Sequence, residues 1–283
     1  MPHPELKQHQ NGAQATNRRI PPSLAPVLSA LELDQPRIVG LDDLASLRTA
    51  HGIRASARDI AHRLQAQGWL LPLRTRGMYE FAPAARAGNY SSGDPFIELR
   101  ATIRRRPDLP VILAYESAAW VRGLSGRAPD RHVLSTKKGA KIPRALSDFR
   151  IVRQYPRLSP DNIDGLPVWK IETMLVFMAA RPELYHDWPN VAEWLPDAVR
   201  KLAYEKLAIE LKGMTQATVV RLAYLIDRGG DKELANQVAR RVSRPTGPVY
   251  LGANRKLGSR DAQYNVVDSL LKPAVRSYAA AGN

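Results

Sequence analysis

The segment from Gly52 to Phe81, GIRASARDIAHRLQAQGWLLPLRTRGMYEF, changes its hydrophobic period in the middle. Its first half repeats apolar residues at the three- and four-residue spacing of a helix, and its second half alternates them as paired strands do. Gly68 separates the two halves. The segment therefore predicts a short amphipathic helix followed by a small hairpin, with arginines along both.

The predicted helix covers Ala55–Gln67. Ser56 stands three residues before Asp59, a variant of the capping box in which Asp replaces the usual Glu. Four apolar residues share one face and should be buried, namely Ala57, Ile60, Ala61 and Leu64. The opposite, outward face carries Arg58, Asp59, His62, Arg63 and Gln65.

Two more helices and a short strand are predicted before this segment. Apolar residues at Leu24, Val27, Leu28 and Leu31 predict a helix over Ser23–Leu33. A strand is expected at Arg37–Val39, followed by a helix that carries Leu41, Leu44 and Leu47 and ends at Gly52. Three helices followed by a hairpin is the order of elements in a winged helix.

A winged helix places the N-terminal half of its last helix in the major groove and its hairpin along the phosphate backbone. Arginine suits the paired acceptors of guanine. We therefore predict DNA contacts from Arg54, Ser56, Arg58, His62, Arg63, Arg74, Thr75 and Arg76. Alternatively, Ser56 only caps the helix and His62 is only a surface residue. The aromatic residues Trp69, Tyr79 and Phe81 are interpreted as core.

A loop rich in Pro, Gly, Ala and Ser at residues 82–95 predicts a domain boundary. We expect a flexible tail at residues 1–22, a winged-helix domain at 23–88 and a C-terminal domain at 89–283. The C-terminal segment mixes strand patterns with helical ones. The predicted fold class is α+β, with an N-terminal winged helix-turn-helix domain followed by a larger mixed α/β domain.

The chain carries 42 Lys and Arg against 27 Asp and Glu, a net charge of +15, which favours a nucleic-acid partner. Residues 100–157 hold 14 of the basic residues and 4 of the acidic ones. We predict a second phosphate-contacting surface in this segment, with Lys137, Lys138 and Lys141 as its representatives. The alternative is an ordinary solvated surface.

The search for catalytic and metal signatures favours no enzyme. The chain has no cysteine, and its 6 histidines show no metal-ligand spacing. Asp197 and the Glu210–Lys212 segment resemble the acid–acid–lysine signature of magnesium-dependent nucleases, but we expect both acids on one helix, about 20 Å apart. No metal or cofactor is predicted. No stretch is apolar enough for a membrane span, and a cytoplasmic protein is expected.

Five segments, in this order, resemble the AbiEi family of antitoxins: RGMYEFAP, DPFIELRATI, AYESAAWVRGL, GLPVWKIETMLVFMAARPE and GPVYLGANRKLGSRDAQYNVV. The resemblance covers residues 23–272. It implies a bacterial repressor that binds inverted repeats in its own promoter and counters a nucleotidyltransferase-like toxin, and it carries no catalytic residues. Direct contact with the toxin and self-association on DNA are left open. The alternatives are a ligand-responsive winged-helix regulator and, less favoured, a nuclease.

Overall fold

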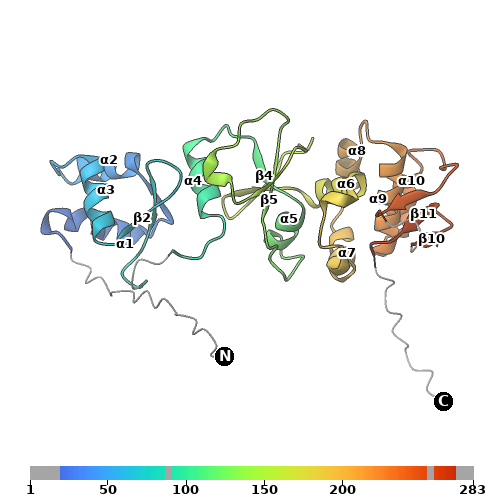
Figure 1. The fold of residues 1–283 in the computed structure, drawn as a ribbon, viewed down its shortest axis with the longest axis horizontal. Coiled ribbons are helices and arrows are strands. Elements are labelled where there is room, and N and C mark those ends of the chain that lie inside the picture. The colour runs from blue at the N-terminus through green and yellow to red at the C-terminus, as the bar shows by residue number, and fades with distance from the viewer. Residues whose placement is uncertain (1–19, 87–90, 254–257, 272–283) are drawn as a thin grey trace, which may run out of the picture. The chain divides into compact units, whose positions relative to one another are not determined.

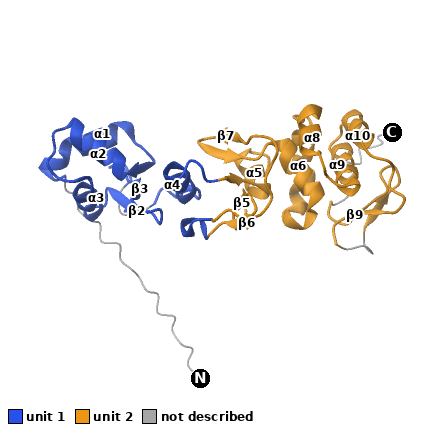
Figure 2. Ribbon diagram, turned by 90° about the horizontal axis from the view of Figure 1, so that it is seen from above, with its two compact units in different colours: residues 1–109, 142–147 blue, residues 110–141, 148–283 orange. Residues whose placement is uncertain are grey.

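The computed structural model describes residues 20–86, 91–253 and 258–271. This part of the chain is an α+β structure with ten α-helices and three sheets (Figure 1). It divides into two compact units: unit 1 comprises residues 1–109 and 142–147, and unit 2 comprises residues 110–141 and 148–283 (Figure 2). Most of the predicted flexible tail, residues 1–19, lies outside the described residues.

Unit 1 follows the order of elements predicted for residues 23–88. A 3-10 turn, η1 (Pro22–Leu24), leads into three helices and three strands: α1 (Ala25–Asp34), β1 (Ile38–Gly40), α2 (Leu41–Ala50), α3 (Ala57–Ala66), β2 (Leu70–Pro72) and β3 (Met78–Phe81). The strands form one antiparallel sheet in the order β1-β3-β2.

The core of unit 1 contains the residues whose spacing predicted burial. Leu24, Val27, Leu28 and Leu31 are buried together with Leu44, Ile60, Ala61, Leu64, Trp69 and Phe81. Leu41, Leu47, Ala57 and Tyr79 are half-buried and pack against this cluster. The interpretation of Trp69 and Phe81 as core residues is therefore correct.

Unit 1 extends beyond the predicted boundary at residues 88 and 89, because helix α4 (Ile97–Arg105) packs against its sheet. Ala101 is completely buried against Ile38 and Met78. The Arg104 guanidinium donates to the carbonyl of Ile38 at 2.8 Å and forms an ion pair with Asp43. A short 3-10 helix, η2 (Arg144–Leu146), also belongs to this unit.

Unit 2 contains a five-stranded mixed sheet in the order β6-β5-β4-β8-β7. Its strands are β4 (Val111–Leu113), β5 (Val133–Thr136), β6 (Arg150–Val152), β7 (Asp161–Ile163) and β8 (Leu166–Val168). Strand β4 is antiparallel to β5 and parallel to β8. Asp164 and Gly165 join β7 to β8 with φ angles of 49° and 75°, as a two-residue hairpin turn requires.

Six helices and a second sheet complete unit 2. They are α5 (Tyr115–Val121), α6 (Ile171–Ala180), α7 (Val191–Val199), α8 (Tyr204–Glu210), α9 (Gln216–Arg228) and α10 (Lys232–Ala239), with strands β9 (Val249–Leu251), β10 (Ser259–Asp261) and β11 (Val266–Asp268). Residues 171–179 of α6 are all buried, including Glu172, whose carboxylate accepts from the Ala203 amide at 3.2 Å. At Gly252, φ is 103° and an added Cβ would lie 2.7 Å from the Leu270 side chain, so this position after β9 requires glycine.

The prediction of one helix through Asp197 and Glu210 is wrong, because the chain leaves the helix after Val199 and starts α8 at Tyr204. Glu210 is completely buried, and it accepts hydrogen bonds from the backbone amides of Arg157 and Leu158 and from the Thr173 hydroxyl at 2.7 Å. Its carboxylate therefore has a structural role.

Within residues 20–86, 91–253 and 258–271, no group of three or more His, Cys, Asp or Glu side chains could hold a metal ion. Among the described helices, none combines the length and the apolarity needed to cross a lipid bilayer.

Candidate nucleic-acid interface

The start of α3 is fixed by a local hydrogen-bond pair. The Ser56 hydroxyl oxygen accepts from the Asp59 amide at 3.2 Å, while the Asp59 carboxylate accepts from the Ser56 amide at 3.3 Å and from its hydroxyl at 2.7 Å. These bonds from Ser56 hold the pKa of Asp59 below its usual value. The predicted capping box is confirmed, and it starts the helix at Ala57, two residues later than expected.

The outward side of α3 is cationic. Arg58, His62 and Arg63 are exposed, on the side opposite the buried Ile60 and Leu64. Arg54, in the loop before the helix, is exposed as well. Within the described part of the chain, the guanidinium groups of Arg54 and Arg58 form no hydrogen bond or ion pair. Their charge is therefore available to a ligand.

The turn between β2 and β3, residues 73–77, is attached to α4 through Glu98. The Glu98 carboxylate accepts from the Arg74 amide at 2.6 Å, the Thr75 amide at 3.3 Å and the Thr75 hydroxyl at 3.2 Å. The Thr75 hydroxyl also lies 3.0 Å from that of Thr102. We call residues 73–77 the wing turn.

Thr75 does not belong with the exposed DNA-contacting candidates. Its side chain is 9% exposed and is occupied by Glu98 and Thr102, so it anchors the wing turn from inside. Arg74 and Arg76 flank it and are exposed. Gly77, with φ of 75°, lets the chain turn back into β3.

The three lysines predicted in the basic segment are exposed around the end of β5. The Lys137 ammonium lies 4.9 Å from the centre of the Tyr155 ring. Arg153 donates to the Ala140 carbonyl at 2.8 Å and thereby holds the loop that carries Lys137 and Lys138. This loop presents Lys137, Lys138 and Lys141 to solvent.

Three other cations of residues 100–157 bond to groups of the protein itself. Arg150 forms an ion pair with buried Glu116 at 2.8 Å and donates to the Leu184 carbonyl. Arg131 donates to the carbonyls of Asp148 and Phe149. Arg104 pairs with Asp43. The basic surplus of this segment therefore overstates the charge that it offers to a ligand.

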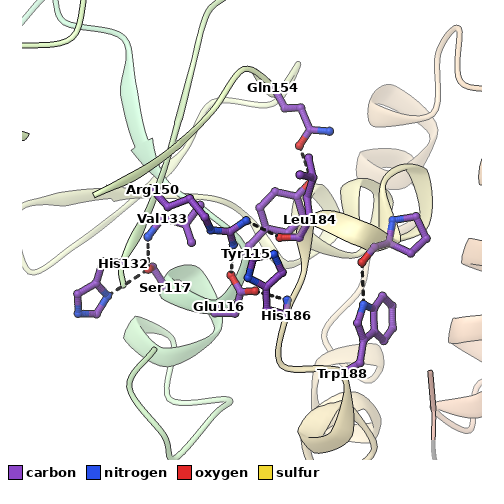
Figure 3. A network of polar contacts seen from close by, with 11 residues as sticks. Tyr115, Glu116, Ser117, His132, Val133, Arg150, Gln154, Leu184, His186 and Trp188 are labelled. Carbon is purple, nitrogen blue, oxygen red and sulfur yellow. Dashed lines mark hydrogen bonds and ion pairs between the residues drawn. The ribbon is translucent and has the colours of Figure 1, made fainter. Parts of the chain in front are cut away.

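Three consecutive side chains at the junction of β4 and α5 form a second polar network (Figure 3). The Tyr115 hydroxyl donates to the Gln154 side chain, and Glu116 accepts from Arg150 and from the His186 amide. Ser117 Oγ accepts from the Val133 amide at 2.7 Å and lies 3.1 Å from His132 Nδ1. The network connects the junction to three separate parts of unit 2.

The backbone at this junction is unusual, since Tyr115 has a φ of 50°, which non-glycine residues seldom adopt. Its ring is buried 4.9 Å from that of Trp169, and burial raises the pKa of its hydroxyl. Burial also lowers the pKa of His132. Because Ser117 is completely buried, its contact with His132 is structural rather than nucleophilic.

Residues 111–228 match the family model of the AbiEi antitoxin C-terminal domain. The chain carries an AbiEi antitoxin C-terminal domain. The AbiEi domain begins with β4 and ends with the last residue of α9, so it contains the Tyr115–Ser117 junction and the exposed lysines. The match confirms the resemblance to AbiEi-family antitoxins and supports an antitoxin role in a toxin–antitoxin system.

The whole fold is similar to that in the crystal structure of the RV2827C protein from Mycobacterium tuberculosis. The two sequences are 27% identical, the TM-score is 0.76, and the similarity covers 91% of this chain and 94% of that chain. It therefore extends well beyond the AbiEi domain. Comparison with curated protein sequences gave no match.

The sequence predicted the exposed arginines of α3 but missed the importance of Glu98 and Glu116. Both carboxylates act on partners more than 20 residues away, at Arg74 and at Arg150. The segment AYESAAWVRGL, which carries the family resemblance, contains the polar junction of β4 and α5. Nothing in its residue spacing indicated that Glu116 pairs with Arg150.

Proposed function

We propose that this chain is a DNA-binding antitoxin that represses transcription of its own toxin–antitoxin operon. In this proposal unit 1 is a winged helix-turn-helix domain that binds inverted repeats in the promoter. The observation that carries the proposal is the outward side of α3. There, exposed Arg58 stands on a capped, well-packed helix and exposed Arg54 lies in the loop before it, and neither guanidinium group has a hydrogen-bond or ion-pair partner among the described residues.

Each element of the interface has its own task. Arg54, Arg58, His62 and Arg63 contact base edges in the major groove, where arginine can bond twice to guanine. Arg74 and Arg76 contact phosphates and position the domain. Ser56 acts through the helix cap. Lys137, Lys138 and Lys141 add phosphate contacts from the AbiEi domain. The partner of the antitoxin is a nucleotidyltransferase-like toxin, and both act in the cytoplasm.

The test is fluorescence anisotropy with the full chain, comparing its own promoter with a shuffled duplex of equal length. Arg58→Ala should weaken promoter binding by about 1–3 kcal/mol, or roughly 5- to 150-fold, because alanine cannot donate the paired hydrogen bonds to a base. Binding to the shuffled duplex should change little. Lys232→Ala removes one exposed charge from α10 and serves as the matched control.

Equal weakening on both duplexes would show that Arg58 contacts phosphate and selects no sequence. A wild-type chain that ignores duplex DNA at low salt would overturn the proposal as a whole.

A further inference from the structure

The C-terminal part of unit 2 contains two adjoining hollows of about 410 and 510 Å³ that share Arg244 and Pro245. Their lining residues come mainly from the end of α10, from the segment that follows it, and from β10 and the turn to β11. Apart from Val220, their lining residues fall outside the AbiEi domain match. The DNA contacts proposed above do not involve these hollows.

Among the described residues, three arginines and no carboxylate line the two hollows. The arginines are Arg240, Arg244 and Arg260. By contrast, the hollow beside Arg150 is lined by the carboxylates Glu116, Asp130 and Asp187 as well as by arginines. The C-terminal hollows therefore have a positive charge that their own lining does not neutralise, which favours an anionic ligand.

Two of these arginines are held in place by neutral acceptors. Arg244 donates to the Ala262 carbonyl at 2.8 Å, and Arg260 donates to the side-chain oxygen of Asn265 at 2.9 Å. Asn265 is buried, with a φ of 55°, and also donates to the Gly247 carbonyl at 2.9 Å. The guanidinium groups are thus positioned before a ligand arrives and keep their full charge.

The nearby carboxylates have other partners. Asp261 accepts from the Tyr264 amide at 2.9 Å, and buried Asp268 accepts from the Tyr224 hydroxyl at 2.9 Å. Neither lines the hollows.

The hollow next to α10 also has an apolar side with polar groups at its edge. Val220, Ala239 and Val242 supply apolar surface, and Asn236 and Gln263 add side-chain amides to the lining. The Gln263 amide nitrogen donates to the Asn236 side-chain oxygen at 3.3 Å and to the Tyr264 hydroxyl at 3.0 Å. This pairing leaves the Asn236 amide nitrogen as a donor and the Gln263 amide oxygen as an acceptor, and the edge of a nucleobase can bond to both. The other hollow, with Arg244 and Arg260, is polar.

We propose that these hollows bind a nucleoside phosphate. The phosphate groups lie against Arg244 and Arg260, where charge-assisted bonds from guanidinium groups are strong. The base lies against Val220 and Val242, with its edge at Asn236 and Gln263. The volumes of the two hollows, about 410 and 510 Å³, fall in the range of small-molecule binding pockets.

The test is isothermal titration calorimetry of the full chain with ATP, GTP, CTP, UTP, tripolyphosphate and adenosine. At least one nucleoside triphosphate should bind more tightly than tripolyphosphate, and adenosine should bind most weakly. Arg244→Ala and Arg260→Ala should each weaken that binding at least tenfold, while Arg244→Lys should weaken it less. Arg200→Ala, an exposed arginine at the end of α7, is the control and should leave binding unchanged. Thermal unfolding of each variant checks that it is folded.

A nucleic-acid backbone is the other source of phosphate, so each variant is also titrated with promoter duplex. If Arg244→Ala weakens duplex binding while no nucleotide binds at millimolar concentration, the hollows serve DNA and the proposal fails. It also fails if tripolyphosphate binds as tightly as every nucleotide, or if nucleotides bind the variants as well as the wild-type chain. These outcomes leave the role of α3 untouched, because Arg58→Ala tests that separately.

Discussion

Glu116 is a buried carboxylate with two partners on different segments. It accepts from the Arg150 guanidinium at 2.8 Å and from the backbone amide of His186. Arg150 in turn donates to the Leu184 carbonyl at 2.9 Å. One side chain in α5 thereby joins β6 to the segment before α7. Removing one member of a buried ion pair is costly, because the other member stays behind without compensation.

We expect Glu116→Ala to lower the free energy of unfolding by about 2–4 kcal/mol, since Arg150 and the His186 amide are both left without this acceptor. Urea unfolding followed by circular dichroism measures the change. Glu193→Ala removes an exposed carboxylate from α7 and should stay within about 0.5 kcal/mol of the wild type. Equal unfolding midpoints for the two variants would contradict the structural role of Glu116.

At the scale of elements, α3 and the wing turn are stabilised in different ways. The cap of α3 is local, since Ser56 and Asp59 are three residues apart. The wing turn depends on α4, whose Glu98 lies more than 20 residues further along the chain. The first arrangement can be recognised in the sequence and the second cannot.

For the cap, Ser56→Ala should raise the pKa of Asp59 toward its ordinary value of 3.8, because the largest cause of its lowering is the Ser56 hydroxyl. A carboxyl with a lowered folded-state pKa stabilises the fold above its unfolded-state pKa, and this contribution disappears as the pH falls through the folded-state value. Wild-type stability should therefore fall more steeply below about pH 4 than that of the variant. Carboxyl titration by NMR measures the pKa, and an identical midpoint in both chains would contradict the expectation.

For the wing turn, Glu98→Ala should speed hydrogen exchange at the Arg74 and Thr75 amides, since both donate to its carboxylate. Amide protection in α3 should stay the same, because its cap does not involve Glu98. Hydrogen exchange followed by NMR distinguishes the two sets of amides. Unchanged exchange at Arg74 would show that other interactions hold the turn.

The sequence was sufficient to predict those parts of the structure that hydrophobic periodicity and helix caps determine. Ile60, Ala61 and Leu64 could be placed in the core, and Ser56 at a helix start, because their neighbours in the sequence determine both. It was insufficient where distant residues pair. Thr75 looked like an exposed turn residue because nothing near it indicates Glu98 and Thr102.

At the scale of the whole molecule, only part of the net charge of +15 can act on a ligand, because some of the basic side chains are already paired within the protein. Composition suggested the middle of the chain as the main basic surface. Arg104 and Arg150 are instead neutralised by Asp43 and Glu116, and Arg131 bonds to carbonyls. Lys137, Lys138 and Lys141, which were predicted for that surface, do face solvent.

We expect replacement of Lys137, Lys138 and Lys141 by Ala to weaken binding to the promoter and to a shuffled duplex by the same factor. The dependence of log K on log salt should become shallower by about 0.9 for each phosphate that the variant no longer neutralises. Titrations at several salt concentrations measure that slope. An unchanged slope would show that these lysines do not touch DNA.

The attachment of the wing turn to Glu98 has an evolutionary consequence. Two of the three hydrogen bonds involve main-chain amides, which every residue except proline possesses. The bond at position 74 uses the main chain, and no bond to Glu98 involves position 76, so mutation can exchange both side chains while the hydrogen bonds to Glu98 remain. Under the DNA-binding proposal, a lineage of such proteins could thus adapt to a drifting target sequence at little cost in folding.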